Sequence, residues 1–299
     1  ASKLEWESGE IERARVLLSR ARERAPSGQV YMKSALLERE QGKLSEALDL
    51  IEAGIKTYPT FSKFYMMGGQ ICSSDLPKSK RTLDRARSFF ERGIQACPSN
   101  SVIWILASRL EETSKQETKA RSLLEVARLK NPKNEALWLE AVRLERRHDN
   151  ERTADTLLAR ALQECPKSGM LLAENIRTAP RSVQKARSAD AIKQAPEDPH
   201  VITAVAQLFA SEGKIEKARK WFNRAVQLNS DFGDAWARYY AFEISAGTAQ
   251  QQKDVENRCI AAAPKHGEVW ASTLKAMENR GKTLSEGLVL VAAAINRQR

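Results

Sequence analysis

The sequence predicts an all-α protein, built as an α–α superhelical solenoid of stacked antiparallel helix pairs. The 299 residues are 42% hydrophobic and 29% charged but only 6% aromatic, a composition typical of folded helical proteins. Proline recurs at intervals of about 34 residues, and each interval holds two apolar-striped segments separated by a turn signal. Helices of about 13 residues are unstable alone in water, so each is expected to bury its apolar stripe against its neighbours.

Prolines mark the end of each predicted helix pair. They stand at Pro26, Pro59, Pro98, Pro132, Pro166, Pro196 and Pro264, and Ser230 fills the slot between the last two. Proline cannot continue a helix, because it lacks a backbone N–H and its ring clashes with the preceding turn. Each is therefore predicted to end the second helix of a pair.

The first helix of a pair carries a recurring aromatic residue and a recurring carboxylate. The tryptophans lie six residues after the proline or Ser230, and a glutamate follows seven residues later. The best matches are Trp104 with Glu111, Trp138 with Glu145, Trp236 with Glu243, and Trp270; Tyr31 with Glu38 is one further match. A catalytic pair is needed once and needs a nucleophile and a base beside it, so recurrence favours a structural motif.

The second helix carries small residues seven positions apart, with an apolar pair between them. The first small residue is Ala14, Ala47, Ala86, Ala120, Ala154, Ala186 or Ala218, and the second is Ala21, Gly54, Gly93, Ala127, Ala161 or Ala225, with Lys193 as the exception. Residues seven apart share one helix face, where small side chains let a neighbouring helix approach closely.

The turns between the two helices contain glycine, in "SGE", "QGK", "EGK", "AGT" and "RGK". Glycine can adopt the positive φ that ends a helix. Two stretches depart from the pattern: an insertion, "SSDLPKSKRT", follows residue 72, and residues 172–195 lack the tryptophan, the glutamate and the apolar pair. The least regular packing is predicted at residues 172–195, where Leu172 replaces tryptophan.

An ionic contact between the two helices of a pair is a further hypothesis. The glutamate lies ten residues before a cation in three pairs, Glu5 before Arg15, Glu111 before Arg121 and Glu243 before Lys253. This spacing would let a first-helix carboxylate meet a second-helix cation across the turn. No cation stands ten residues after Glu38 or Glu145, so the contact is expected in only part of the chain.

The pattern predicts one domain, a single solenoid over residues 1–299 with about eight and a half repeats. "LEWESGEIERAR" aligns with "LEREQGKLSEAL", so the chain is expected to open inside a first helix, as an N-terminally truncated fragment of a longer protein. "EGLVLVAAAINRQR" reads as a final second helix.

The formal net charge of +11 favours anionic partners, either nucleic acid or acidic protein surfaces. The candidate partner surface comprises Arg13, Arg20 and Arg24 on one helix, and Lys78, Lys80 and Arg81 in the insertion. The alternative interpretation is that these side chains form solvated helix faces, because isolated surface charges contribute little.

Several function classes lack their sequence signals. No apolar run is long enough to span a membrane and there is no signal peptide, so no membrane association is expected. The cysteines Cys72, Cys97, Cys165 and Cys259 are dispersed, as are the three histidines, so neither a disulfide framework nor a metal site is expected. No P-loop, GxSxG or HExxH is present, and no enzyme activity, cofactor or small-molecule substrate is expected.

The repeat type follows from two offsets in the first helix and from the sequence pattern of the second helix. A tetratricopeptide (TPR) unit would place glycine four residues after the tryptophan position and an aromatic residue seven after it, but here the positions hold Ser108, Val142 or Tyr240, and then glutamate. The second helices read "ARSFFERG", "ARSLLEVA" and "ARKWFNRA". The chain resembles half-a-TPR (HAT) repeats, which are found mainly in RNA-processing proteins.

A closer resemblance covers residues from about 128 to 270. "LKNPKNEALWLEAVRLE", "LLARALQECPKSG", "DPHVITAVAQLF" and "KARKWFNRAVQLNSDFGDAWARYYAFEISAGT" are similar to the C-terminal repeats of the pre-mRNA-processing factor six family. The resemblance implies a nuclear, non-enzymatic scaffold that bridges the constituent snRNPs of the spliceosomal tri-snRNP. Its implied partners are spliceosomal snRNP proteins, with possible snRNA phosphate contacts. Direct RNA binding by the solenoid is the alternative, and a TPR-type chaperone or peptide adaptor is a third.

Overall fold

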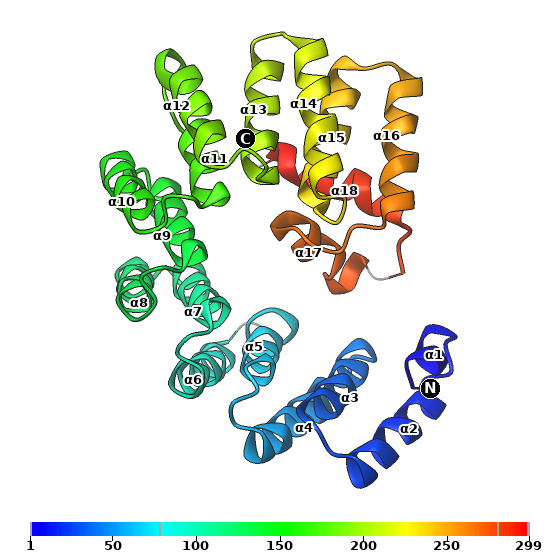
Figure 1. Ribbon diagram of the computed structural model, residues 1–299. Helices are drawn as coiled ribbons and strands as arrows, with labels where there is room; N and C mark the ends of the chain where they lie inside the picture. The colour runs from blue at the N-terminus through cyan, green and yellow to red at the C-terminus, as the bar shows by residue number, and fades with distance from the viewer. Residues whose placement is uncertain (1, 78, 280, 298–299) are drawn as a thin grey trace. The chain divides into compact units, whose positions relative to one another are not determined.

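The computed structural model describes residues 2–77, 79–279 and 281–297 (Figure 1). The chain divides into two compact units, Ala1–Ala154 and Asp155–Arg299, and each is treated by itself below. The protein is all-α, a superhelical repeat fold of antiparallel helix pairs, as the sequence predicts. The described residues form no β-strand beyond a single isolated bridge between Phe232 and His266.

The first unit contains α1 (Ser2–Glu7), α2 (Ile11–Arg24), α3 (Gly28–Glu40), α4 (Leu44–Thr57), α5 (Lys63–Gln70), the π-helical turn η1 (Ile71–Asp75), α6 (Lys80–Ala96), α7 (Ser101–Thr113), α8 (Glu117–Lys130), α9 (Glu135–Arg147) and the start of α10 (Glu151–Glu164). The second unit continues α10 and contains α11 (Gly169–Arg177), α12 (Arg181–Gln194), α13 (Pro199–Ser211), α14 (Ile215–Leu228), α15 (Gly233–Ala246), α16 (Ala249–Ala262), α17 (Glu268–Leu274), the 3₁₀ turn η2 (Met277–Asn279) and α18 (Leu284–Arg297). The insertion after residue 72 falls at η1 and the start of α6.

Side-chain caps begin many of the first helices. The N-caps Ser27, Asn100, Asn134, Ser168 and Asp198 each accept a hydrogen bond from a backbone N–H of the first turn. These short polar residues follow each proline by one or two positions and satisfy N–H groups that the helix itself leaves unpaired. The caps therefore fix the start of these five first helices close behind the preceding pair.

The turns within a pair use positive φ, at Gly9, Gly42, Gly213 and Gly281, as their glycines predict. Two non-glycine residues, Lys115 and Asp149, take the same conformation between their helices. The prediction for "AGT" is wrong, because Gly247 has a φ of −104° and an extended backbone. Thr248 caps α16 directly instead, so that turn needs no left-handed residue.

Small residues on the second helices are buried where helices approach closely. Ala86, Ala120 and Ala218 are fully buried, as are Ala14, Ala47 and Ala154. A Cβ added at Gly93 would lie 2.7 Å from Cβ of Tyr65, so that position has no room for a side chain. These contacts seal the core between adjacent helices.

Residues 172–195 contain an atypical pair. α11 has nine residues where α7, α9 and α13 have 13, and α12 buries only Ser188 and Ala191. The expectation that Ala186 continues the alanine pattern is wrong, because Ala186 is exposed. The interval from Pro166 to Pro196 is shorter than the other proline intervals, so Gln184 and Ala191 hold the positions of Ala154 and Ala161.

Candidate interaction surface

The recurring tryptophans are tied to the recurring prolines. The indole N–H of Trp104 donates to the carbonyl of Pro98 at 2.9 Å, and that of Trp138 to Pro132 at 2.7 Å. Trp236 and Trp270 make the same bond to Ser230 and Pro264, at 2.9 and 3.0 Å. All four side chains are buried. The six-residue spacing thus satisfies a buried donor and joins each first helix to the turn before it.

The recurring glutamates pair with arginines of the preceding helix, not the following one. Glu38 accepts two hydrogen bonds from Arg15 at 2.7 and 2.8 Å, and Glu111 two from Arg87 at 2.7 and 3.0 Å. Glu145 takes two bonds from Arg121, and Glu243 takes two from Arg219. The hypothesis that Glu5 meets Arg15, Glu111 meets Arg121 and Glu243 meets Lys253 is wrong.

The partners are second-helix arginines that belong to the preceding helix pair. They also supply the cations that Glu38 and Glu145 were expected to lack. The glutamate side chains are nearly buried, and the side chain of Glu243 is only 1% exposed. Hydrogen bonding to the carboxylates raises the pKa of the Arg15, Arg87 and Arg219 guanidinium groups. The bidentate geometry makes these pairs directional links between successive repeats.

One repeat replaces both members of the ion pair with apolar residues. Leu48 occupies the arginine position in α4 and Cys72 occupies the matching glutamate position, and their exposures are 2% and 1%. Burying either charge without the other would be costly, so the two positions are expected to change together. The chain thus shows two ways of filling one interhelical position.

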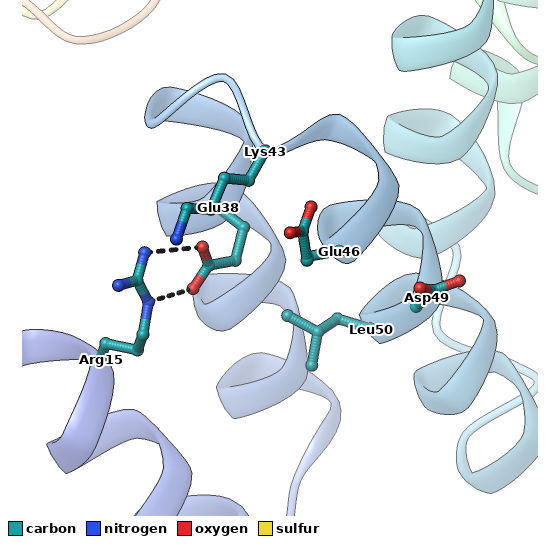
Figure 2. A pocket seen from close by; sticks show the side chains of 6 residues that line it. All are labelled: Arg15, Glu38, Lys43, Glu46, Asp49 and Leu50. Carbon is teal, nitrogen blue, oxygen red and sulfur yellow. Dashed lines mark hydrogen bonds and ion pairs between the residues drawn. The ribbon is translucent and has the colours of Figure 1, made fainter. Parts of the chain in front are cut away.

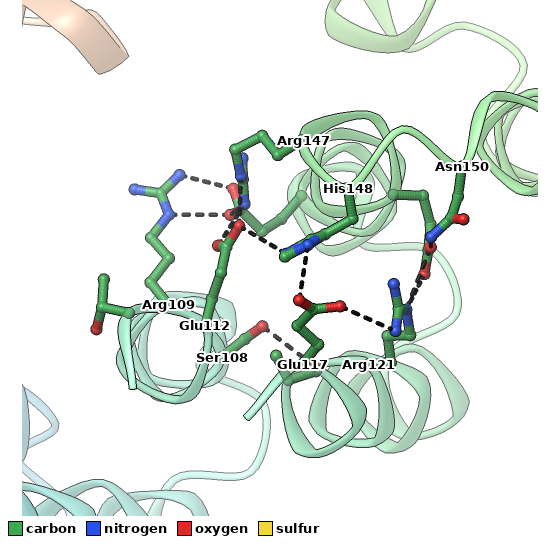
Figure 3. Close-up of polar contacts among 12 residues, drawn as sticks. Ser108, Arg109, Glu112, Glu117, Arg121, Arg147, His148 and Asn150 are labelled. Atoms are coloured by element: carbon green, nitrogen blue, oxygen red, sulfur yellow. Dashed lines mark hydrogen bonds and ion pairs between the residues drawn. The ribbon is translucent and has the colours of Figure 1, made fainter. Parts of the chain in front are cut away.

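A second ionic network joins α7 to α9 (Figure 3). Arg109 donates to Glu140 at 3.0 and 2.6 Å, and Arg147 donates to Glu112 at 2.8 Å and to Glu140 at 2.9 Å. Burial raises the pKa of the Glu140 carboxyl, but the hydrogen bonds and charges of the two arginines lower it by more, so the net shift is downward. His148 lies 3.4 Å from Glu112 and 3.2 Å from Glu117.

The candidate basic residues of α2 are exposed along one side of the helix, opposite the buried Ala14 and Leu18. Arg13 makes a loose ion pair with Glu10 at 3.7 Å. Lys80 is exposed at the start of α6. Lys78 lies outside the described residues, and only the backbone of Arg81 is described. The structure therefore places Arg13, Arg20 and Arg24 on one side of α2, and their contact with a partner stays a prediction.

Two of the depressions on the described surface bear on the repeat pattern. One, of about 480 Å³, lies beside the Arg15–Glu38 pair and is lined also by Lys43, Glu46, Asp49 and Leu50 (Figure 2). The other, of about 700 Å³, lies between the end of α10, α11 and α12, where sequence reasoning had expected irregular packing. The sequence signals at this place are the losses of the tryptophan, the glutamate and the apolar pair, which predict irregular packing but not a groove.

The remaining polar residues give no further site. No cluster of three or more potential metal ligands occurs within the described ranges, and none of the helices described is long and apolar enough to cross a membrane. Cys72 and Cys259 are buried, and burial raises the pKa of the Cys259 thiol to about 12. Cys97 donates its thiol hydrogen to the Thr60 carbonyl at 3.2 Å, which ties it into the turn after Pro59.

Comparison with known proteins gives two family models and several curated relatives. A model described as "PRP6, TPR-like domain" matches residues 70–286, and a tetratricopeptide repeat model matches residues 1–60. The chain is 47% identical over 289 residues to "Protein STABILIZED1" of Arabidopsis thaliana, covering 97% of this chain and 28% of the relative. It is 38% identical over 294 residues to "Pre-mRNA-splicing factor prp1" of Schizosaccharomyces pombe, covering 98% of this chain and 31% of the relative.

Further matches are shorter or more distant. "Pre-mRNA-processing factor 6" of Homo sapiens is 48% identical over 115 residues, 38% of this chain and 12% of the relative. The chain thus spans less than a third of the length of these curated relatives. Among solved structures, yeast Tom70 aligns over 97% of this chain and 59% of its own with a TM-score of 0.56 and 13% identity, which shows a shared fold alone. With the PRP6 model matching more than two thirds of its residues, the chain belongs to the PRP6 TPR-like domain family.

Proposed function

We propose that this chain is a non-enzymatic scaffold in pre-mRNA splicing, which bridges snRNP components of the tri-snRNP through protein contacts on its helical-repeat surface. The observation that carries the proposal is family membership together with relatives named as pre-mRNA splicing and processing factors. The chain is then a nuclear protein, and residues 1–299 act as one HAT-repeat domain of about eight and a half repeats within a longer polypeptide. Its partners are spliceosomal snRNP proteins.

The distribution of side chains supports protein contacts. The most conspicuous recurring groups, the tryptophans and the Arg–Glu pairs, are used inside the repeats and leave the exposed outer positions for partners. Repeat scaffolds present such outer positions over a long surface.

Direct RNA binding is the second candidate, and the charge of +11 favours it. Single-stranded RNA is commonly held by aromatic rings on which its bases stack. Here Trp104, Trp138, Trp236 and Trp270 are buried and their indole N–H groups are occupied, so they offer no stacking platform. Phosphate contacts from basic side chains such as Arg13, Arg20 and Arg24 would remain possible.

Affinity capture from nuclear extract, with and without nuclease, tests the proposal. Retention of snRNP proteins after RNA is destroyed is the expected result. Loss of every snRNP protein with the RNA would replace the scaffold with the RNA-binding candidate.

Salt dependence of RNA binding gives an independent measurement. Neutralising phosphates releases counterions, so direct RNA binding should weaken steeply as salt rises. The triple variant Arg13→Glu, Arg20→Glu, Arg24→Glu would reduce that salt slope if α2 contacts phosphate. Each single variant, such as Arg20→Glu, is compared with Lys253→Glu, which makes the same change of charge at an exposed position of α16.

A further inference from the structure

The tryptophan of a regular repeat fills a slot between two consecutive second helices. Trp138 lies under the guanidinium of Arg128 from the preceding second helix, 4.7 Å from its ring centroid, and donates to the Pro132 carbonyl. Trp236 lies beside Arg258 of the following second helix, at 5.7 Å, and donates to the Ser230 carbonyl. Each tryptophan is 3% exposed. The slot therefore has two helical walls and one carbonyl acceptor.

In the repeat formed by α11 and α12 the residues that fill this slot are absent. Leu162, Pro166 and Leu172 stand one repeat after Arg128, Pro132 and Trp138. On α12, Arg187 and Ser188 occupy the place of the apolar pairs Leu157–Leu158 and Trp221–Phe222 of the second helices on either side in the sequence. The structure has an open groove of about 700 Å³ here, lined by Leu162, Pro166 and Leu172 together with residues of α12.

The next repeat shows how the chain closes the slot when tryptophan is missing. Ile202 takes the tryptophan position and is fully buried, in the same hydrophobic cluster as Phe222 of α14. The Pro196 carbonyl accepts a hydrogen bond from Nη2 of Arg224 at 3.2 Å. By contrast, the carbonyl of Pro166 accepts no hydrogen bond from any residue that the structure describes. This repeat lacks both the ring and the donor that complete its neighbours.

The rim of the groove is basic. Lys167, Arg187 and Lys193 line it against a single carboxylate, Asp190, which lies 4.0 Å from Lys193. Arg187 is held in place by donating to Oδ1 of Asn175 at 2.6 Å. An apolar floor with a cationic rim complements an apolar ring carried on an acidic chain.

We propose that this groove binds an acidic segment of a partner protein that inserts a tryptophan side chain between α10 and α12. The indole N–H would donate to the Pro166 carbonyl, and the acidic neighbours of the tryptophan would face Lys167 and Lys193. The occupant follows from the chain itself, because four of its own tryptophans fill the equivalent slot and make the equivalent hydrogen bond. The proposal rests on the scaffold function and specifies one of its contacts.

A purified chain and a synthetic peptide test this directly. The probe is a fluorescein-labelled peptide with one tryptophan flanked on both sides by acidic residues, and binding is followed by fluorescence anisotropy. Replacing the peptide tryptophan with alanine should weaken binding by at least about tenfold, because a buried aromatic anchor dominates such contacts.

Leu172→Trp fills the slot with the residue that the other repeats use, and it should also weaken binding by at least about tenfold. Leu228→Trp, which adds the same ring at an exposed position of α14, is the matched control and should leave binding unchanged. Circular dichroism and the melting temperature establish that both variants are folded. Should Leu172→Trp not fold, Lys167→Glu with Lys193→Glu changes only exposed side chains and should weaken binding by about tenfold at low salt.

Equal binding of the tryptophan and alanine peptides would overturn the proposal, as would unchanged binding to folded Leu172→Trp. Displacement of the peptide by an oligouridine that binds more tightly would assign the groove to RNA instead. Capture of snRNP proteins by the wild-type chain is a separate result. If the peptide does not bind but snRNP proteins are still captured, only the proposal for the groove is rejected. If snRNP proteins are no longer captured, the proposed scaffold function is rejected.

Discussion

The repeat around α9 and the repeat around α11 differ at nearly every position that defines the pattern. In the first, Trp138 is buried against Arg128, and Glu145 accepts hydrogen bonds from Arg121. In the second, Leu172 and Ala179 replace the tryptophan and the glutamate. One repeat uses its characteristic side chains for internal packing, while the other leaves an open groove. The difference teaches that the recurring tryptophan, glutamate and arginine stabilise the repeat, and that a repeat without them leaves surface exposed for contacts.

The largest stability effect is expected at the slot itself. Trp138→Ala should lower the free energy of unfolding by about 3–5 kcal/mol, because it empties a fully packed site and strands the Pro132 carbonyl. Leu172→Ala should cost about 2 kcal/mol, because its surroundings already open into the groove. Urea denaturation of both variants measures the two losses. If Leu172→Ala lowers the free energy of unfolding as much as Trp138→Ala or more, the two repeats do not differ in packing as described.

The second-largest loss of stability is expected when an Arg–Glu ion pair is broken. Arg219→Leu leaves the buried Glu243 carboxylate unpaired and should lower stability by about 2–4 kcal/mol. Adding Glu243→Cys should recover more than half of the loss, because Leu48 and Cys72 already fill the equivalent positions in another repeat. Lys253→Leu, at the cation that the sequence had suggested as partner, should change stability by less than about 0.5 kcal/mol. If Lys253→Leu costs as much as Arg219→Leu, the assignment of partners is wrong.

The α7–α9 network should respond to acid. The pKa of Glu140 lies below its ordinary value of 4.5 in the folded chain, so its contribution to stability is fully present above that value. That contribution is lost as pH falls through the lowered folded-state pKa. Glu140→Gln should therefore destabilise the chain near neutral pH and show a smaller loss of stability on acidification below 4.5 than the wild type. Glu151→Gln, at an exposed position, is the control, and identical acid profiles for Glu140→Gln and wild type would contradict the prediction.

The smallest effect concerns thiol reactivity. Burial raises the pKa of both the Cys72 and Cys97 thiols, but Cys72 is enclosed in the core whereas Cys97 is partly exposed. Alkylation by iodoacetamide at pH 8 should modify Cys97 at least about tenfold faster than Cys72. Mass spectrometry of timed digests gives both rates. Comparable rates would show that the core around Cys72 opens readily.

Much of the fold was predictable, because packing residues recur once per repeat. Proline positions gave the pair boundaries, and the tryptophan spacing marked the first helix of each pair. The hydrogen bond from each indole to the preceding turn was not predicted and is seen only in the structure. The ionic partners were not predictable from spacing. Glu111 has Arg87 before it and Arg121 after it, and these two arginines hold the same position in successive repeats, so periodicity cannot choose between them. Only the packing of one pair on the next decides it.

Residues 172–195 were harder for a related reason. Pro166 and Pro196 lie closer together in the sequence than Ala154 and Ala186 do, so two periodic signals disagree about the register of α12. Burial of Ser188 and Ala191 follows the proline signal, because the end of the helix is fixed by its cap. The groove could not be predicted at all, since it arises from what several replaced side chains jointly fail to fill.

The direction of the Arg–Glu and Trp–Pro links has a consequence for grafting and shuffling repeats. Both links run from a second helix or its closing turn into the first helix of the following pair, as from Arg87 to Glu111 and from Pro98 to Trp104. A cassette cut at the prolines would sever both links at each end. A cassette cut in the turn within a pair, from Lys115 to Asp149, would carry Arg121 with Glu145 and Pro132 with Trp138 intact. The unit that can be transferred with its links intact is therefore a second helix followed by the next first helix. It is offset by one helix from the proline-to-proline repeat of the sequence.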